Sequence, residues 1–386
     1  MRQGTPGFVG ERLREAREAR GVQASDLASQ LGVSRQAISQ YENGGVSPHP
    51  EVMRRIANIL DLPVRYFCQA PRTDLGTTLF YRSLARATST ARKKSTARFN
   101  WLVDITNWVT RYVDLPAVNL PQIDVPADPA LISTDDVERA AEICRKHWGI
   151  GDGPLPNVVR LLERSGVVVA RGAVSEDIDA FSTWVSDRPY VFLGKDKSAA
   201  RGRFNALHEL GHLVLHRRVE QGLANRHEIH SLLESQAHRF AGALALPAQA
   251  FAADLRGSTM PYFQALKPKW VMSIGSMIYR AADLCLINQE QVQRLWKQRA
   301  RLGWRDSEPW DDEIPVEEPF LLRRSIELIL REAIISKEDI LAEISLGAAD
   351  VEDLVGLPPG FFAATSEAAS GGGKIIPFSR RQNRSR

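Results

Sequence analysis

The sequence predicts a mainly α protein with a small antiparallel sheet, an α+β fold, on the basis of three observations. Residues 1–70 and the stretch from about 256 to 366 have helical periodicity with short turns. Around Asp187, the segment DAFSTWVSDRPYVFLGKD alternates apolar and polar residues in two short runs, which is typical of a β-hairpin. With 44% hydrophobic and 25% charged residues over 386 positions, the chain is long enough for two or three domains.

The composition argues against a membrane or secreted protein. No run of 18 or more apolar residues is present, and the opening MRQGTPGFVGERLREAREARG lacks the apolar centre of a signal peptide. The three cysteines, Cys68, Cys144 and Cys285, are far apart and form no CxxC pair, so neither a disulfide scaffold nor a thiolate zinc site is expected. We therefore expect a cytoplasmic protein with no membrane partner.

Proline, glycine and charge divide the chain into five predicted parts. These are a helical part (1–70), a helical connector with the proline-rich linker LPAVNLPQIDVPADP (71–129), a central domain (130–255), a helical C-terminal domain (256–366) and a basic disordered tail (367–386). The first 115 residues carry a net charge of +7, whereas residues 116–370 carry −8. Nucleic acid is therefore expected to bind at the front of the chain.

The first part has the geometry of a helix-turn-helix. LREAREARG ends one helix at Gly21, SDLASQLG ends a second at Gly32, and SRQAISQYENG begins a third with Ser34 as N-cap. Arg reads guanine and Gln reads adenine in the major groove, so the predicted DNA-binding residues are Arg35, Gln36, Ser39 and Gln40. The competing interpretation is a generic helical bundle with a solvated polar face.

The stretch NALHELGHLVLH, residues 205–216, has two histidines four positions apart on one helical face. At that spacing His208 and His212 can both reach one ion at about 2.0–2.1 Å, and neutral imidazole is a good zinc ligand. Glu209 follows the first histidine and can act there as the general base that takes a proton from water. The competing interpretation is a pair of histidines on a buried helical face, satisfied by ordinary hydrogen bonds.

A zinc site of this kind needs a third protein ligand. His216 repeats the four-residue step but lies about 12 Å along the helix from His208, which is too far for one ion on a straight helix. We expect it behind the site or in the core. The next segment, SLLESQAHRFAGALALP, carries Glu234 and His238 on one helical face, and an antiparallel return would bring that face to the metal.

Residues 16–67 resemble the Cro/C1-type (XRE) helix-turn-helix domain along nearly their whole length, most specifically in VSRQAISQYENG. The resemblance implies that Asn43 and Gly44 close the recognition helix near the phosphates, and that bases are read by Arg35, Gln36 and Gln40. The usual Thr-Gln opening of the second helix is here Gln23 and Ala24. A customary phosphate contact is therefore expected to be missing or replaced.

HELGHLVLH followed by ExxAxxFAxxLxLP is similar to the ImmA/IrrE family of zinc metallopeptidases over about residues 130–255. The resemblance implies a zincin-like domain with Zn²⁺ as cofactor, Glu209 as catalytic residue, and Glu234 as the ligand that joins His208 and His212. His238 stands where the family usually has Asn, so a histidine ligand that replaces or joins Glu234 stays open. The order of the parts also resembles fused bacterial regulators of this family.

These motifs predict a DNA-binding transcriptional regulator that carries a zinc-dependent endopeptidase domain and hydrolyses a repressor-like protein. The expected partners are double-stranded DNA, a protein or peptide substrate, and a second copy of the chain in a homodimer. The alternative is a DNA-binding regulator whose peptidase-like domain senses a metal or a partner without catalysis. Intact His208, Glu209 and His212 favour the enzyme, because a pure binding module has no need of Glu209.

Overall fold

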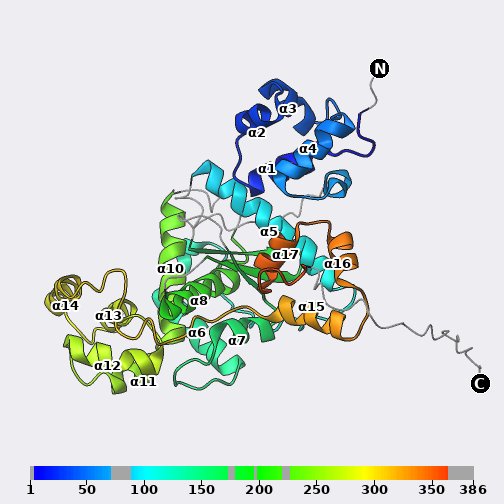
Figure 1. The fold of residues 1–386 in the computed structure, drawn as a ribbon. Helices are drawn as coiled ribbons and strands as arrows, with labels where there is room; N and C mark the ends of the chain where they lie inside the picture. Colours follow the sequence, from blue (N-terminus) through cyan, green and yellow to red (C-terminus); the bar gives the residue numbers. More distant parts are fainter. Residues whose placement is uncertain (1–3, 71–87, 173–178, 195–197, 220–226, 364–386) are drawn as a thin grey trace, which may run out of the picture.

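The structure is a computed structural model that describes residues 4–70, 88–172, 179–194, 198–219 and 227–363. The predicted tail, 367–386, and the beginning of the predicted connector, 71–87, lie outside the described residues. Helices dominate, and one three-stranded sheet lies among them (Figure 1). The predicted α+β class is therefore confirmed. Among the described helices, none is long and apolar enough to cross a membrane.

The N-terminal bundle contains the predicted helix-turn-helix. Its elements are α1 (Gly10–Ala19), α2 (Ala24–Leu31), α3 (Arg35–Glu42), α4 (Pro50–Leu60) and the 3-10 helix η1 (Val64–Cys68). α2 ends where Gly32 adopts the left-handed conformation, with φ of 67°. Ser34 begins α3 by accepting a hydrogen bond from Ala37 N. The first three helices meet through fully buried side chains, Leu13, Leu27 and Ile38.

One long helix, α5 (Ser89–Val109), connects the bundle to the sheet (Figure 1). On the bundle side it packs along α1, and Trp101 Nε1 donates a 2.9 Å hydrogen bond to the Tyr66 hydroxyl in η1. On the sheet side the Phe99 ring meets Phe181 and Tyr190 edge-on, with centroids 5.7 and 5.5 Å away. The bundle and one face of the sheet therefore share a single apolar core.

The sheet joins β1 (Val168–Arg171), β3 (Arg188–Leu193) and β2 (Ala180–Val185), in that order. β2 and β3 form the predicted hairpin, with Phe181 opposite Phe192. β1 pairs parallel to β3, with Val168 beside Tyr190, so the sheet is mixed and not purely antiparallel as expected. Residues 167–170 are an unbroken apolar run buried on both faces, which leaves no alternating pattern to detect.

The second apolar core lies on the other face of the sheet. Along β1, Val168 and Ala170 belong to the first core and Val169 to the second. The helices around the second core are α6 (Thr134–His147), α7 (Val158–Arg164), α8 (Ala199–Leu215), α10 (His227–Ala245) and α11 (Ala248–Asp254). α8 lies against the sheet, and α10 packs along α8 and α6 (Figure 1). Ser133 caps α6 as predicted.

The helices after α11 are divided between the two cores. The second core receives α12 (Met260–Trp270), α13 (Ile274–Asp283) and α14 (Gln289–Arg301). The first core receives α15 (Leu321–Arg331), α16 (Lys337–Ile344) and α17 (Ala348–Val355), which pack against α5. Figure 1 shows the two groups well separated. The predicted C-terminal part, 256–366, thus contributes to two regions of the molecule, and its boundaries stay a prediction.

The turn between α12 and α13 has the same build as the turn between α2 and α3. Val271 is left-handed with φ of 52°, and Ser273 caps α13 by accepting a hydrogen bond from Ser276 N. Gly32 and Ser34 do the same in the bundle. α13 differs from α3 because most of its residues are buried and it packs against α10. The unit α12–α14 therefore covers one side of α10 through α13.

Candidate metal centre and nucleic-acid interface

α8 and α10 bring three side chains together, which we call the metal cluster. His208 and His212 lie one helical turn apart on α8, with their Nε2 atoms 3.1 Å from each other. From α10, Glu234 places Oε2 3.3 Å from His208 Nε2 and Oε1 3.3 Å from His212 Nε2. One ligand atom from each residue lies within 4.8 Å of the others. The structure thus gathers the three residues that the resemblance implies as ligands.

The spacing of the metal cluster fits a tetrahedral ion. Ligand atoms about 2.0–2.1 Å from tetrahedral zinc lie about 3.3 Å from one another. The two Nε2 atoms are 3.1 Å apart, and each lies 3.3 Å from a different carboxylate oxygen of Glu234. Oε1 of Glu234 is buried and, within the described chain, has no hydrogen-bond partner. A buried carboxylate oxygen beside two imidazole nitrogens suits a cation between them. The donor set therefore fits Zn²⁺.

Charge within the metal cluster shifts the protonation of its members. Burial raises the pKa of Glu234, but contacts with His208 and His212 outweigh burial and hold that pKa well below its usual range. Burial lowers the pKa of His208, but Glu234 and Glu209 outweigh it, so the pKa of His208 lies above its ordinary value. Glu234 is therefore ionised at neutral pH, which is the form that binds a cation.

Gly211, between the two histidines, allows α10 to approach α8 closely. A Cβ atom at this position would lie 3.1 Å from Phe240 Cδ1 and 3.2 Å from the Cα of Ala237. The second atom is backbone of α10 and cannot turn aside as a side chain can. The glycine of HELGH therefore sets the separation of the two helices that supply the metal cluster, a role that the motif alone does not indicate.

A chain of hydrogen bonds behind the metal cluster orients His212. Its Nδ1 lies 2.9 Å from Nδ1 of fully buried His216, and His216 Nε2 lies 3.1 Å from Gln236 Oε1 on α10. The Gln236 amide donates in turn to the carbonyls of Pro129 and Ile132. Such partners fix the orientation of a ligating imidazole. His216 lies behind the cluster, where its distance along the helix predicts it, and Gln236 was missed.

Glu209 lies on the sheet side of α8, next to the metal cluster. It is buried, and its Oε2 accepts a 2.7 Å hydrogen bond from Ser182 Oγ of β2. The negative charge of Glu209 helps to raise the pKa of His208. Ser182 holds the carboxylate beside the cluster, and its contribution was also missed. The signal for it is a pair of hydroxyl residues, Ser182 and Thr183, on a buried strand.

His238 lies one helical turn beyond Glu234 and outside the metal cluster. Its ring packs between Phe204 of α8 and Tyr279 of α13, with centroid distances of 4.8 and 5.8 Å. Burial and the charge of His208 lower the pKa of His238. Of the two candidates on α10, Glu234 is the residue that the structure brings to His208 and His212.

The predicted DNA-reading residues share the outer face of α3. Helix positions one, two, five and six place them on one side, and all four are exposed: Arg35, Gln36, Ser39 and Gln40. Ser39 Oγ also accepts a 3.4 Å hydrogen bond from Asn43, the C-cap of α3. An exposed helix with Arg and Gln near its N-terminus is suited to the major groove.

A buried ion pair holds α3 against α1. Arg17 Nε lies 2.6 Å from Glu42 Oε1, and both side chains are almost excluded from solvent. Arg17 also donates to the carbonyl of Val22. At the other end of α1, a Cβ atom on Gly10 would lie 2.1 Å from the carbonyl oxygen of Tyr41. The orientation of α3 thus depends on contacts that local sequence patterns did not predict.

Gln23 occupies the position where the resemblance led us to expect a change. It is the N-cap residue of α2, and its side chain does not cap the helix. Instead, its Nε2 donates a 3.2 Å hydrogen bond to Thr90 Oγ1 at the start of α5. The residue at this position therefore contacts the next helix of the protein.

Two protein families match separate parts of the chain. Residues 13–67 match the family described as helix-turn-helix, and residues 162–281 match the IrrE N-terminal-like domain. The second match begins near the end of α7 and ends in α13, so it includes the metal cluster and part of the unit α12–α14.

The curated relatives are similar to this chain over limited lengths. A protein of Thermoplasma volcanium named "Putative HTH-type transcriptional regulatory protein" is 28% identical over 155 residues, which are 40% of this chain and 42% of the relative. Proteins of the same name from Pyrococcus furiosus and Methanocaldococcus jannaschii are 44% and 42% identical over 55 residues, or 14% of this chain and 18% and 17% of the relatives. The chain thus matches less than half the length of each.

Proposed function

We propose that this chain is a DNA-binding transcriptional regulator with a zinc-dependent endopeptidase activity. The proposal rests on the matches to a helix-turn-helix domain and to an IrrE N-terminal-like domain. The observation that carries the enzymatic part is the convergence of His208, His212 and Glu234 beside a buried carboxylate, Glu209. The proposed substrate is a repressor-like protein, and the proposed partner of the bundle is double-stranded DNA. The relatives named as HTH-type regulators support the regulatory part.

Each residue at the site has a proposed task. His208, His212 and Glu234 would hold the metal, and zinc bound there would supply a Lewis acid that polarises a substrate carbonyl and water. Glu209 accepts the proton that water loses as it attacks the peptide carbonyl, and then delivers it to the leaving amine.

Two further contacts would prepare these residues. Ser182 keeps the Glu209 carboxylate in place through its 2.7 Å hydrogen bond. His216 and Gln236 keep the His212 ring oriented, so that Nε2 points into the metal cluster.

The proposed DNA interface is the exposed face of α3. Arg35, Gln36 and Gln40 would contact base edges, and Ser39 lies between them. Because the helix is braced by the buried Arg17–Glu42 pair, it would enter the groove as a rigid element. A homodimer, which would pair two such helices on one operator, also stays a prediction.

The test separates metal binding from catalysis. Purified full-length protein is assayed for bound zinc and for cleavage of a diverse peptide library, with cut positions read by mass spectrometry. We expect one zinc per chain and cleavage in the unchanged protein, no zinc in His212→Ala, and full zinc without cleavage in Glu209→Gln. His49→Ala serves as the matched control, because this histidine lies in the bundle and outside the metal cluster.

Two outcomes would contradict the proposal. Full zinc occupancy in His212→Ala would show that the metal site is elsewhere. Zinc without cleavage of the peptides, in a protein that still binds duplex DNA, would favour the non-catalytic alternative in which the domain senses a metal or a partner.

A further inference from the structure

A cavity of about 310 Å³ opens beside the metal cluster. Its lining includes Asn205, three residues before His208 on α8, and His238, four residues after Glu234 on α10. One helical turn advances about 5.4 Å, so the cavity begins about that distance from the metal ligands. Across the cavity lie residues of α13, α14 and the loop after α14. The cavity thus borders both helices that carry the metal cluster, one helical turn from its residues, which do not themselves line it.

Four aromatic rings in successive contact line this cavity, and we call them the ring wall. Phe204 of α8 contacts His238 of α10 at 4.8 Å, His238 contacts Tyr279 of α13 at 5.8 Å, and Tyr279 contacts Trp296 of α14 at 5.0 Å between centroids. All four line the cavity. Tyr279 is 52% exposed although most of α13 is buried. The wall therefore presents ring surface that no described side chain covers completely.

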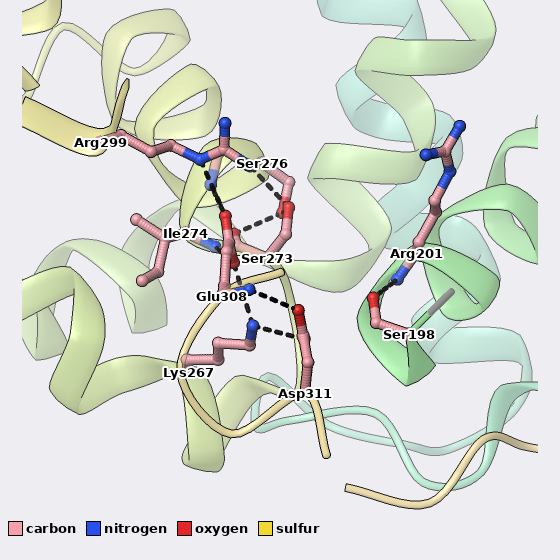
Figure 2. A network of polar contacts seen from close by, with 10 residues as sticks. Ser198, Arg201, Lys267, Ser273, Ile274, Ser276, Arg299, Glu308 and Asp311 are labelled. Atoms are coloured by element: carbon pink, nitrogen blue, oxygen red, sulfur yellow. Dashed lines mark hydrogen bonds and ion pairs between the residues drawn. The ribbon is translucent and has the colours of Figure 1, made fainter. Parts of the chain in front are cut away.

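A buried ionic network holds the far side of the cavity in place. Lys267 is fully buried, and its Nζ lies 3.0 Å from Glu308 Oε2 and 2.6 Å from Asp311 Oδ1. Glu308 also accepts hydrogen bonds from Ile274 N and Gly275 N in the first turn of α13. Figure 2 shows this network on one side of the view and Ser198 and Arg201, at the start of α8, on the other. These contacts therefore fix the loop after α14 to α12 and α13 before any ligand arrives.

The charged groups around the cavity are largely neutralised by one another. Arg299 Nε lies 3.0 Å from Glu308 Oε1, and Arg201 NH2 lies 2.9 Å from both carboxylate oxygens of Asp179. Arg305 and Asp306, of opposite sign, complete the rim. A ligand that enters would therefore meet aromatic faces and paired charges, which favours an uncharged, flat group over a strongly charged one.

We propose that this cavity is the pocket that selects an aromatic side chain of the peptide substrate, in the residue next to the bond that is cut. The inference rests on the proposed peptidase function. The volume is at the lower end of the range for ligand pockets, about 300–1,000 Å³, so it suits one side chain and not a folded partner. Successive residues of an extended peptide lie about 3.3 Å apart, and an aromatic side chain adjoining the metal therefore reaches the ring wall.

The test measures binding as well as cleavage. Zinc-loaded full-length protein is titrated calorimetrically with phenylalanine hydroxamate and alanine hydroxamate, which share a zinc-binding group and differ only in the side chain. We expect the phenylalanine compound to bind at least about tenfold more tightly, because it gains several ring contacts. Tyr279→Ala should reduce that preference about three- to tenfold, the loss of one or two ring pairs, whereas Tyr279→Phe should retain it.

Tyr262→Ala is the matched control. Tyr262 is 44% exposed on α12 of the same unit and does not line the cavity, so this variant should keep the aromatic preference. Because Tyr279 is largely exposed, its replacement should leave the unfolding temperature nearly unchanged. In the peptide library, cut sites should be enriched for Phe, Tyr or Trp beside the cut bond, and Tyr279→Ala should weaken that enrichment.

The outcomes distinguish the two proposals. Tight binding of both hydroxamates with equal affinity, or an aromatic preference that Tyr279→Ala leaves intact, would overturn the pocket and leave the metallopeptidase assignment standing. If neither compound binds to protein that contains zinc, the metal is closed to ligands and both proposals fail.

Discussion

Neighbouring side chains fix the orientation of Glu209 and His212 at the candidate metal centre. Ser182 holds Glu209, and His216 with Gln236 orients His212. Each contact removes rotational freedom from a side chain that has a proposed role, so less ordering is needed when a ligand binds. On the proposed DNA side, the side chains of Arg35, Gln36 and Gln40 are exposed on α3, which leaves them room to adapt to base edges.

Arg35 provides a test of base reading at the scale of one residue. We expect Arg35→Ala to cost about 1–3 kcal/mol in binding to the preferred duplex, because a bidentate contact to guanine is lost. The loss on random duplex should be smaller, since that binding depends on phosphate charge. The preferred duplex is first selected from a random library, and affinities are measured by fluorescence anisotropy at fixed salt. Arg139→Ala, at an exposed position of α6, is the control. Equal losses on both duplexes would make Arg35 a phosphate contact.

At the scale of secondary-structure elements, pairs of helices determine where functional side chains meet. α8 and α10 approach closely at Gly211, so the residues of the metal cluster converge. α7 and α15 are joined by Glu163 of α7, whose Oε1 accepts hydrogen bonds from Phe320 N and Leu321 N at the start of α15. A carboxylate at that end also interacts favourably with the helix dipole. Both junctions connect segments that are distant in sequence.

Gly211→Ala should weaken the metal site although alanine favours helix by about 1 kcal/mol. The new Cβ would press on the Ala237 backbone at 3.2 Å and on Phe240 at 3.1 Å, which moves Glu234 away from the histidines. We expect weaker zinc binding in competition with a chelator and a lower unfolding temperature. Gly242→Ala on α10 is the control, because its Cβ would meet only Arg280 Cδ at 3.8 Å, and it should be neutral or stabilising. Equal zinc affinity in both variants would show that the helices can separate without cost.

Glu163 should make stability depend on pH. Burial raises the pKa of Glu163 to about 7, although the hydrogen bonds from Leu321 N and Phe320 N lower it. A carboxyl whose pKa is higher in the folded state stabilises the fold fully below its unfolded pKa, about 4.3, and loses this contribution as pH rises through 7. Relative to Glu163→Gln, the free energy of unfolding should therefore fall by about 2–3 kcal/mol between pH 5 and pH 8. Urea unfolding at four pH values measures it, with Glu290→Gln as control. Parallel profiles for the wild type and Glu163→Gln would refute the prediction.

Across the molecule, the first apolar core joins the N-terminal bundle to the sheet. An ion pair also joins α17 to the bundle. Arg20 at the end of α1 forms two 2.6 Å hydrogen bonds with the carboxylate of Asp350 on α17. Arg98 of α5 lies 3.6 Å from the same carboxylate, and the Arg20 guanidinium stands over the Trp101 ring. The other face of the sheet carries α8, so bundle and metal cluster are built on opposite sides of one element.

Removing the Arg20–Asp350 ion pair should weaken the attachment of the bundle to α17 and lower the free energy of unfolding. Asp350→Ala leaves Arg20 and Arg98 without their shared partner, and the cost should approach the about 3–5 kcal/mol of a broken buried pair, reduced because the Arg20 side chain is 22% exposed. Urea unfolding and amide hydrogen exchange in α4 and α17 measure the effect. Arg323→Ala, which breaks an exposed pair with Glu327, should cost only about 0.3–0.5 kcal/mol. Similar values for the two variants would mean that Asp350 is a surface contact.

Features that depend on neighbouring residues could be predicted from the sequence alone. Gly32 and Ser34 set the turn of the helix-turn-helix, the two runs around Ser186 and Asp187 set the hairpin, and the four-residue step from His208 to His212 places both rings on one face. Each follows from backbone preferences or helical spacing within a few positions. The α+β class could be predicted for the same reason.

The meetings between distant segments could not be predicted from the sequence and are known from the fold. β1 joins the sheet in parallel, Gln236 and Ser182 reach the site from other elements, and α17 contacts α1 across 330 positions of sequence. The ring wall also assembles from four helices, and none of them alone indicates a pocket. Such pairings depend on which apolar faces exclude water together, and this free energy is shared among all segments of the core and not written in any one of them.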